Sequence, residues 1–232
     1  MHQTGVKVVF YEKNFLGYIA VTNTTDPEMN ITASHCYHIF DECIKNYHLH
    51  DYVDQPLLNP YQTGKINDLL YQKNWIDTVQ WHLEDIIRDP QIKPDAAILI
   101  KRRIDTSNQE RTDIVEQIDD YFLNLFKDAA KGDDARLNTE TPAWVIDRLS
   151  ILALKIYHMH EQTHRVDSSE EHRQKCQLKL NILLDQKHDL STSFDELIED
   201  IRSGRRYMKV YRQMKMYNDA SLNPILYSQK NK

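Results

Sequence analysis

Glycine and proline are rare in this chain and lie far apart, which constrains its fold more than any other feature. There are 5 glycines and 7 prolines among 232 residues. Both residues interrupt regular structure, because glycine is flexible and proline lacks a backbone N–H group. They leave three long uninterrupted stretches, residues 65–89, 95–131 and 142–203. Stretches of this length predict long helices.

Apolar residues recur every three or four positions from about residue 34 onward, which is the spacing of one helix face. We expect a short helix there, then one that ends before Pro90 and one from about Asp95 to Phe126. The stretch 142–203 has room for two more. The sequence therefore predicts an all-α, antiparallel up-and-down bundle of four long helices and a short N-terminal helix.

Capping residues mark where the last two long helices begin. Thr141 and Pro142 suit the N-cap and first helical position of one helix. Ser168 and Glu171 have the spacing of a capping box, which predicts the start of the other. Gly204 suits the C-terminal end of that helix.

The first 28 residues differ in composition from the rest. β-branched and aromatic segments within residues 5–22 predict a small β-hairpin. Because an isolated hairpin is only marginally stable, we favour the alternative that the reading frame extends upstream of a natural start at Met29. Either way, we expect residues 1–28 to be an extension and residues 29–232 to form a single helical domain.

Charge and composition argue against several functional classes. The formal net charge of -6 disfavours a general nucleic-acid binder. No apolar run has transmembrane length, and the N-terminus lacks a signal-peptide pattern. Cys36, Cys43 and Cys176 are odd in number and lack C-x-x-C spacing, so we expect free thiols. These features predict a cytoplasmic protein without a transmembrane segment.

Polar and charged side chains interrupt the apolar helix stripes. Burying such groups unpaired costs on the order of several kcal/mol each, so they should pair with one another. The resulting network either fixes the register of the helices or lines a polar pocket inside the bundle. The residues concerned are Lys73, Gln80, Glu84, Lys101, Asn108, Arg111, Asp147, Arg148, Lys155 and His158.

Further polar residues lie beside these stripes. His82 and Asp85 share a neighbouring side of the second helix. Glu84 and Arg88 are four residues apart with the acid first, which favours an ion pair. Asp105 is one turn from Lys101 and from Asn108.

The segment 202–216 contains six basic residues and no acidic one. Tyrosine and methionine residues lie between them, so a basic C-terminal helix here would have one basic and one apolar side. Lys209, Arg212 and Lys215 are its candidate ligand-binding residues. The segment either packs back onto the acidic bundle or binds a phosphate-rich ligand or an anionic membrane surface.

The histidines predict no metal site. His160 and His164 share a helix face, whereas His158 points to another side. No glutamate completes an H-E-x-x-H pattern. We therefore expect a surface histidine pair at 160 and 164.

The carboxylates suggest a different cofactor under one alternative. Glu116 and Asp119 match half of the magnesium-binding pattern of all-α nucleotide pyrophosphohydrolases of the MazG type, in which two acidic helices face each other. Glu84 and Asp85 resemble the other half only loosely. Magnesium is expected only if this alternative holds, and no other cofactor is indicated.

The charged residues on the stripes belong to longer motifs. These motifs are Trp81–Asp85 with Arg88, Lys101–Asp105 with Asn108, Arg111, Asp113 and Glu116, Glu140–Pro142, Asp147–Lys155 with His158, Lys209–Gln213 and Lys215–Asp219. Through them, residues from about 35 to 229 resemble the uncharacterised bacterial family called domain of unknown function 4254. The resemblance implies no established activity. Family members are often encoded near envelope-polysaccharide glycosyltransferases, which implies a role in polysaccharide biosynthesis.

Three functional hypotheses follow. The first is an enzyme or binder of a phosphorylated or otherwise anionic small molecule, such as a sugar nucleotide. The cations at 88, 111, 148 and 155 would hold the anion, and His82, Glu84, Asp85 or Asp105 would move a proton. The second is a non-catalytic partner of the glycosylation machinery that docks through its basic C-terminal segment. The third is the magnesium pyrophosphohydrolase.

Overall fold

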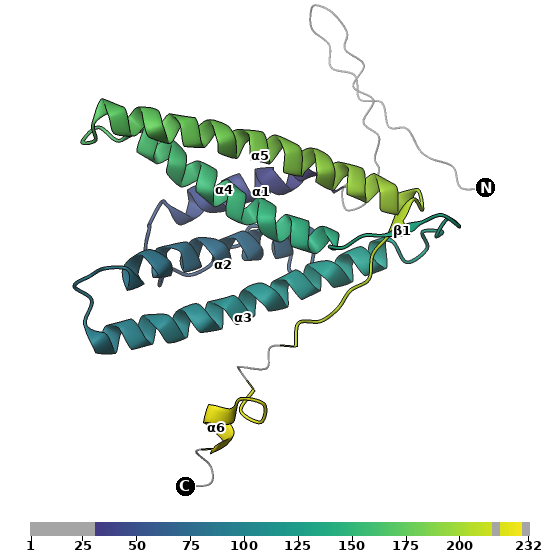
Figure 1. The fold of residues 1–232 in the computed structure, drawn as a ribbon, viewed down its shortest axis with the longest axis horizontal. Coiled ribbons are helices and arrows are strands. Elements are labelled where there is room, and N and C mark those ends of the chain that lie inside the picture. The colour runs from purple at the N-terminus through teal and green to yellow at the C-terminus, as the bar shows by residue number, and fades with distance from the viewer. Residues whose placement is uncertain (1–30, 215–218, 229–232) are drawn as a thin grey trace, which may run out of the picture. The chain divides into compact units, whose positions relative to one another are not determined.

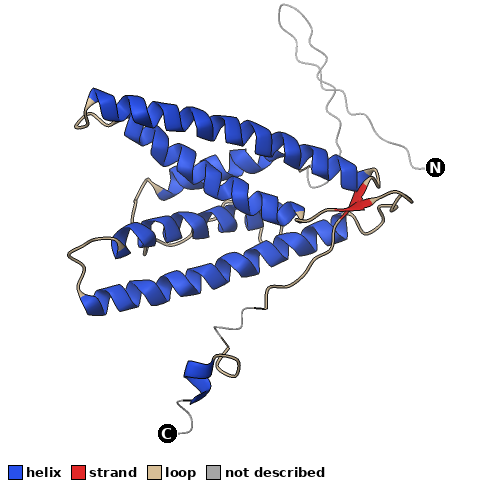
Figure 2. Cartoon of the chain, in the orientation of Figure 1, coloured by secondary structure: helices blue, strands red, loops and turns tan. Residues whose placement is uncertain are grey.

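The computed structural model describes residues 31–214 and 219–228, and it confirms the predicted all-α bundle (Figure 1). Its elements are α1 (Ala33–Tyr47), α2 (Ile66–Ile87), α3 (Pro94–Leu125), β1 (Arg136–Leu137), α4 (Pro142–His164), α5 (Glu170–Arg202), β2 (Arg206–Tyr207) and α6 (Pro224–Ser228). The two strands form a small parallel bridge, drawn in red in Figure 2. No helix in the described ranges is long and apolar enough to cross a bilayer. The predicted hairpin and Met29 lie outside the described residues.

Two helical hairpins and the short helix α1 make up the bundle. The helices α2 and α3 lie side by side, as do α4 and α5, and α1 packs against α2 and α4 (Figure 1). The predicted stripe of α1 is buried, with Ile39 and Phe40 fully inaccessible. The first half of α4 is buried nearly all round from Ala143 to Leu154, as expected for a helix with other helices on several sides.

The three cysteines lie in the core. Cys36, Cys43 and Cys176 are all free and buried, as predicted. Burial raises the pKa of the Cys36 and Cys43 thiols, because the interior disfavours the charged thiolate. They pack as small apolar side chains.

The predicted helix starts are correct for α4 and wrong by one residue for α5. Thr141 is the N-cap and Pro142 the first residue of α4, although the Thr141 hydroxyl makes no capping hydrogen bond. The N-cap of α5 is Ser169, which accepts a hydrogen bond from the backbone N–H of His172 (3.2 Å). Ser168 instead donates to the carbonyl of Arg165 (2.8 Å), so it closes the turn before the helix.

The predicted basic C-terminal helix is not formed by residues 203–214, which make a turn, strand β2 and an extended segment. Gly204 adopts a left-handed conformation with a φ of 75° and ends α5, as predicted. Its carbonyl accepts a hydrogen bond from Gly132 (3.1 Å), and Arg136 then pairs in register with Arg206. These contacts with the 132–138 segment replace the hydrogen bonds that a continued helix would make.

We predict that Gly204→Ala destabilises the protein more than Gly64→Ala. Both glycines have positive φ, so each substitution costs about 1–2 kcal/mol for the left-handed conformation. A Cβ at residue 204 would also lie 2.2 Å from the carbonyl oxygen of Ala130, whereas one at residue 64 meets nothing within 4 Å. Urea unfolding should show a further loss of at least about 1 kcal/mol for Gly204→Ala. Equal losses would contradict this account of the turn.

Candidate functional site

Four charged side chains from three helices meet inside the bundle and form the charge cluster, defined as Lys73, Asp77, Arg111 and Asp147. The ammonium group of Lys73 is fully buried, pairs with Asp77 one turn further along α2, and lies 3.0 Å from Oδ1 of Asp147 on α4. Arg111 of α3 holds the same Asp147 carboxylate through Nε (2.8 Å) and Nη2 (2.9 Å). Two cations therefore face two carboxylates, so burial leaves no net charge.

Neutral polar groups complete the hydrogen bonding around Asp77. The hydroxyl of Ser150 on α4 donates to Oδ2 of Asp77 (2.6 Å), and the side-chain amide of Asn74 donates to the same hydroxyl (3.0 Å). Asn74, Asp77 and Ser150 are all buried. Because each bond joins α2 to α4, the network links these helices in a defined register.

The two carboxylates of the charge cluster differ in acidity. Burial alone would raise the pKa of Asp147, but hydrogen bonds from Arg111 and the charge of Lys73 outweigh it and lower the pKa below its usual value. Burial raises the pKa of Asp77, and the charge of Lys73 together with hydrogen bonds from Lys73 and Ser150 offsets this only in part. Asp147 is therefore the more firmly ionised partner.

Arg111 connects the charge cluster to the surface. Its side chain is 29% exposed and lines two pockets. The first, called the Trp81 pocket, has a volume of about 320 Å³ and is lined by Asp77, Gln80, Trp81, Glu84, Asp85, Arg88, Arg111, Ile151 and Leu154. The second, called the Trp144 pocket, has about 310 Å³ and is lined by Asn108, Arg111, Thr112, Val115, Trp144, Asp147 and Gln213.

The Trp81 pocket brings together several of the predicted site residues. Arg88 pairs with Glu84 at 2.8 Å, as the i,i+4 spacing predicted. Glu84 and Asp85 lie in the last turn of α2 and Arg88 is its C-cap, and Ile151 and Leu154 of α4 add apolar surface. The pocket thus combines donors, acceptors and an aromatic wall.

The basic C-terminal segment packs back onto the bundle. Arg212 contacts the carboxylates of Glu116 (3.4 Å) and Asp120 on α3, and the backbone N–H of Gln213 donates to Glu116 (2.9 Å). Arg205 and Arg206 both pair with Asp200 at the end of α5. Arginines of the segment that the docking hypothesis uses as its docking surface are therefore already paired within the chain. Lys209 is exposed, and Lys215 lies outside the described residues.

Other predicted site residues lie on the surface, apart from both pockets. Lys101 and Asp105 pair with each other on the exposed side of α3. Arg148 pairs with Glu140 (2.6 Å), and Lys155 is exposed. In contrast, Gln80 of α2 donates a hydrogen bond from Nε2 to Oδ1 of Asn108 on α3 (3.0 Å).

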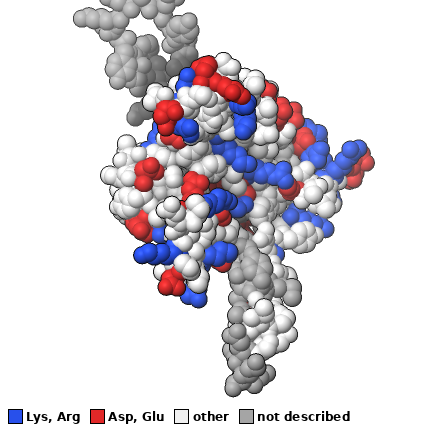
Figure 3. All heavy atoms as spheres, turned by 60° about the vertical axis from the view of Figure 1, so that its left-hand side comes forward, with Lys and Arg blue, Asp and Glu red and all other residues white. Residues whose placement is uncertain are grey.

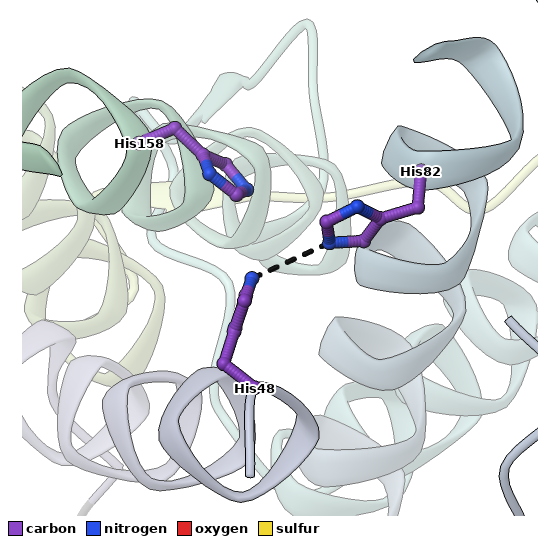
Figure 4. A group of neighbouring side chains, drawn as sticks. All are labelled: His48, His82 and His158. Carbon is purple, nitrogen blue, oxygen red and sulfur yellow. Dashed lines mark hydrogen bonds between the residues drawn. The ribbon is translucent and has the colours of Figure 1, made fainter. Parts of the chain in front are cut away.

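The two predicted histidines come together in the structure with a third that the sequence did not single out. His82 of α2 and His158 of α4 point toward His48, which follows the last residue of α1 (Figure 4). Burial lowers the pKa of His82, because it disfavours the charged imidazolium. None of the three lines either pocket. His160 and His164 are an exposed pair, as predicted.

The two carboxylate sets of the pyrophosphohydrolase hypothesis occupy different levels of the α2–α3 pair. The bond between Gln80 and Asn108 fixes the register of the two helices. Glu116 lies about 12 Å further along α3, in the direction away from Glu84. Within the described ranges, no three carboxylates approach one another closely enough to share an ion.

Charges of both signs are mixed on the face shown in Figure 3. Lysine and arginine side chains lie there among aspartate and glutamate side chains, and a run of basic side chains crosses the middle of the face.

We predict that Asp147→Asn lowers the free energy of unfolding by about 3–5 kcal/mol at neutral pH, because Lys73 and Arg111 lose their shared carboxylate. Since folding lowers the pKa of Asp147, its contribution is complete above the usual value of 3.8 and is lost as the pH falls below it. Urea unfolding at several pH values should show the gap between wild type and variant narrowing only in that acid range. The neighbouring Arg148→Gln, which breaks an exposed pair, should cost about 1 kcal/mol or less. A similar small cost for Asp147→Asn would show that the charge cluster is not stabilising.

Comparison with known proteins agrees with the resemblance seen in the sequence. No curated protein and no solved structure matches the chain. A family model described as "Protein of unknown function (DUF4254)" matches residues 67–210, which runs from the second residue of α2 to beyond β2 and includes every residue of the charge cluster. The match covers more than half of the chain but is shorter than the span of about 35–229 expected from the motifs. The chain therefore belongs to the DUF4254 family.

Proposed function

We propose that this chain binds a phosphorylated or otherwise anionic small molecule, of about the size of a sugar phosphate, in the Trp81 pocket. The observation that carries the proposal is that two guanidinium groups, those of Arg88 and Arg111, line one pocket of about 320 Å³. Pockets of a few hundred Å³ hold small ligands in many proteins. Arginine suits phosphate and carboxylate groups because its planar guanidinium offers paired N–H donors.

The two arginines are prepared for an anion in different ways. Arg88 is paired with Glu84 in an exposed position, and such pairs are worth only about 1 kcal/mol or less, so Arg88 can turn to a ligand at small cost. Arg111 is held in place because Asp147 binds its Nε and Nη2. The Arg111 guanidinium, which lines the pocket, is thereby kept in a fixed orientation.

The rest of the lining favours a sugar as the uncharged part of the ligand. The Trp81 indole, Ile151 and Leu154 offer apolar surface for the face of a ring. Gln80, Glu84 and Asp85 offer acceptors for hydroxyl groups. A sugar phosphate would also suit the envelope-polysaccharide setting that the family resemblance implies.

If the chain is an enzyme, Glu84 and Asp85 are the best candidates for moving a proton. Both carboxylates line the same pocket as the two arginines, within reach of one bound ligand. His82 and Asp105, the other two candidates from the sequence, do not line it.

We predict that glucose 1-phosphate and UDP-glucose raise the melting temperature of the protein, whereas uncharged glucose does not. Calorimetric titration should show that Arg88→Ala weakens the binding of glucose 1-phosphate by roughly 10- to 100-fold, because a charged hydrogen bond is lost. Arg148→Ala is the matched control, since Arg148 is exposed and lies outside both pockets, and it should bind as wild type does. Equal responses to glucose and glucose 1-phosphate, no binding of either phosphate, or full affinity in Arg88→Ala would refute the proposal.

A further inference from the structure

We infer that His48, His82 and His158 form a binding site for a divalent transition-metal ion such as Zn²⁺. The three side chains come from the end of α1, from α2 and from α4, and they point toward one another in Figure 4. One ring nitrogen of each lies within 4.8 Å of the others. Three imidazoles from separate elements are a ligand set found in zinc proteins. The inference does not depend on the proposed anion binding.

Hydrogen bonds on the outer side of two rings fix which nitrogen faces the centre as an acceptor. Nδ1 of His48 lies 2.7 Å from the carbonyl oxygen of Ile44, and Nδ1 of His158 lies 2.9 Å from the carboxylate of Glu161. Because both oxygens are acceptors, Nδ1 carries the hydrogen in each ring. In the neutral rings, Nε2 then keeps its lone pair. Carbonyl and carboxylate partners of this kind typically orient histidines that bind metals.

One hydrogen bond joins the rings of His48 and His82, but it leaves Nε2 of His158 without a partner among the described residues. Nε2 of His82 lies 3.3 Å from Nε2 of His48, so His82 can donate to His48. Nε2 of His158 is buried and has no hydrogen-bond partner among the described residues. Buried polar atoms without a partner are rare, and an ion at the centre would satisfy all three rings. The distance of 3.3 Å is close to the roughly 3.4 Å expected between two nitrogens that bind one tetrahedral Zn²⁺.

Aromatic neighbours hold the rings in this arrangement. The Trp81 indole stacks on His158 with ring centres 4.9 Å apart, and the Tyr47 ring stacks on His82 at 5.1 Å. Tyr157 packs against His48 at 4.5 Å. Ligands that are already oriented lose little conformational entropy on binding an ion.

A carboxylate beside the histidines can provide a fourth ligand. Oδ1 of Asp51 lies 3.7 Å from Nε2 of His82 and 4.0 Å from Nε2 of His48. Three nitrogens with one oxygen favour ions such as Zn²⁺, Co²⁺ or Ni²⁺ over Mg²⁺ and Ca²⁺, which prefer oxygen ligands. Because the Asp51 side chain is 57% exposed, the fourth position is open to water or to another ligand.

The test is metal binding by purified protein without a histidine tag, since a tag would supply imidazoles of its own. Wild type should bind a single Co²⁺ with the intense visible absorption of a tetrahedral complex, and Zn²⁺ should displace it. Zn²⁺ at about 100 times its dissociation constant should raise the melting temperature by roughly 5–10 °C, because the ion joins three helices of the folded state.

His158→Ala should abolish both the absorption and the melting-temperature shift while circular dichroism shows that the metal-free protein is folded. His160→Ala is the matched control, because its ring is exposed on the same helix, and it should retain both responses. If His158→Ala does not fold, His82→Gln provides the second variant and should give the same loss. Absence of the tetrahedral Co²⁺ spectrum in wild type, or its persistence in the histidine variants, would overturn the site. Failure to bind sugar phosphates would leave this result unchanged, because the metal alone is the probe.

Discussion

The described bundle depends on the burial of opposite charges between α2, α3 and α4. Lys73 is fully inaccessible and Asp147 nearly so, and an ion left unpaired in such a place costs several kcal/mol, on the order of 3–5. Asp147 is within reach of both Lys73 and Arg111, so it joins the three helices at one level. We infer that the charge cluster fixes the rotation and register of these helices more strictly than their interchangeable apolar contacts do.

The same cluster positions the surface features that lie next to it along α2. Asp77 belongs to the charge cluster, and the turns that follow carry Trp81, which lines the Trp81 pocket, and His82, which points toward the other histidines. The Trp81 indole also stacks on His158 of α4. Because α2 is held to α4 by Lys73 and Asp77, the pocket and the histidine group share one rigid support. Trp81 therefore contacts both the pocket and the histidine group.

Much of the fold could be predicted because it follows from local rules. The spacing of glycine and proline and the helical period located all five helices of the bundle, and charges on the apolar stripes predicted a buried network. Which side chains pair within this network depends on tertiary packing. Asp77 was missed although it stands four residues after Lys73, a spacing that could have indicated an ion pair. His48 was missed because it lies just beyond its helix and meets the other histidines only in space. The basic helix was predicted wrongly because Gly132, far away in sequence, binds Gly204.

The most direct test of this account is a double-mutant cycle on the pair Lys73 and Asp77, measured as the free energy of unfolding in urea. Lys73→Met and Asp77→Leu each leave the charge cluster with one uncompensated buried charge, whereas the double variant leaves the bidentate pair of Arg111 and Asp147 intact. The account predicts a loss of about 3–5 kcal/mol for each single variant. It also predicts that the double variant loses about 2–3 kcal/mol less than the sum of the two single losses. Losses that simply add would contradict the claim that these charges act as one unit.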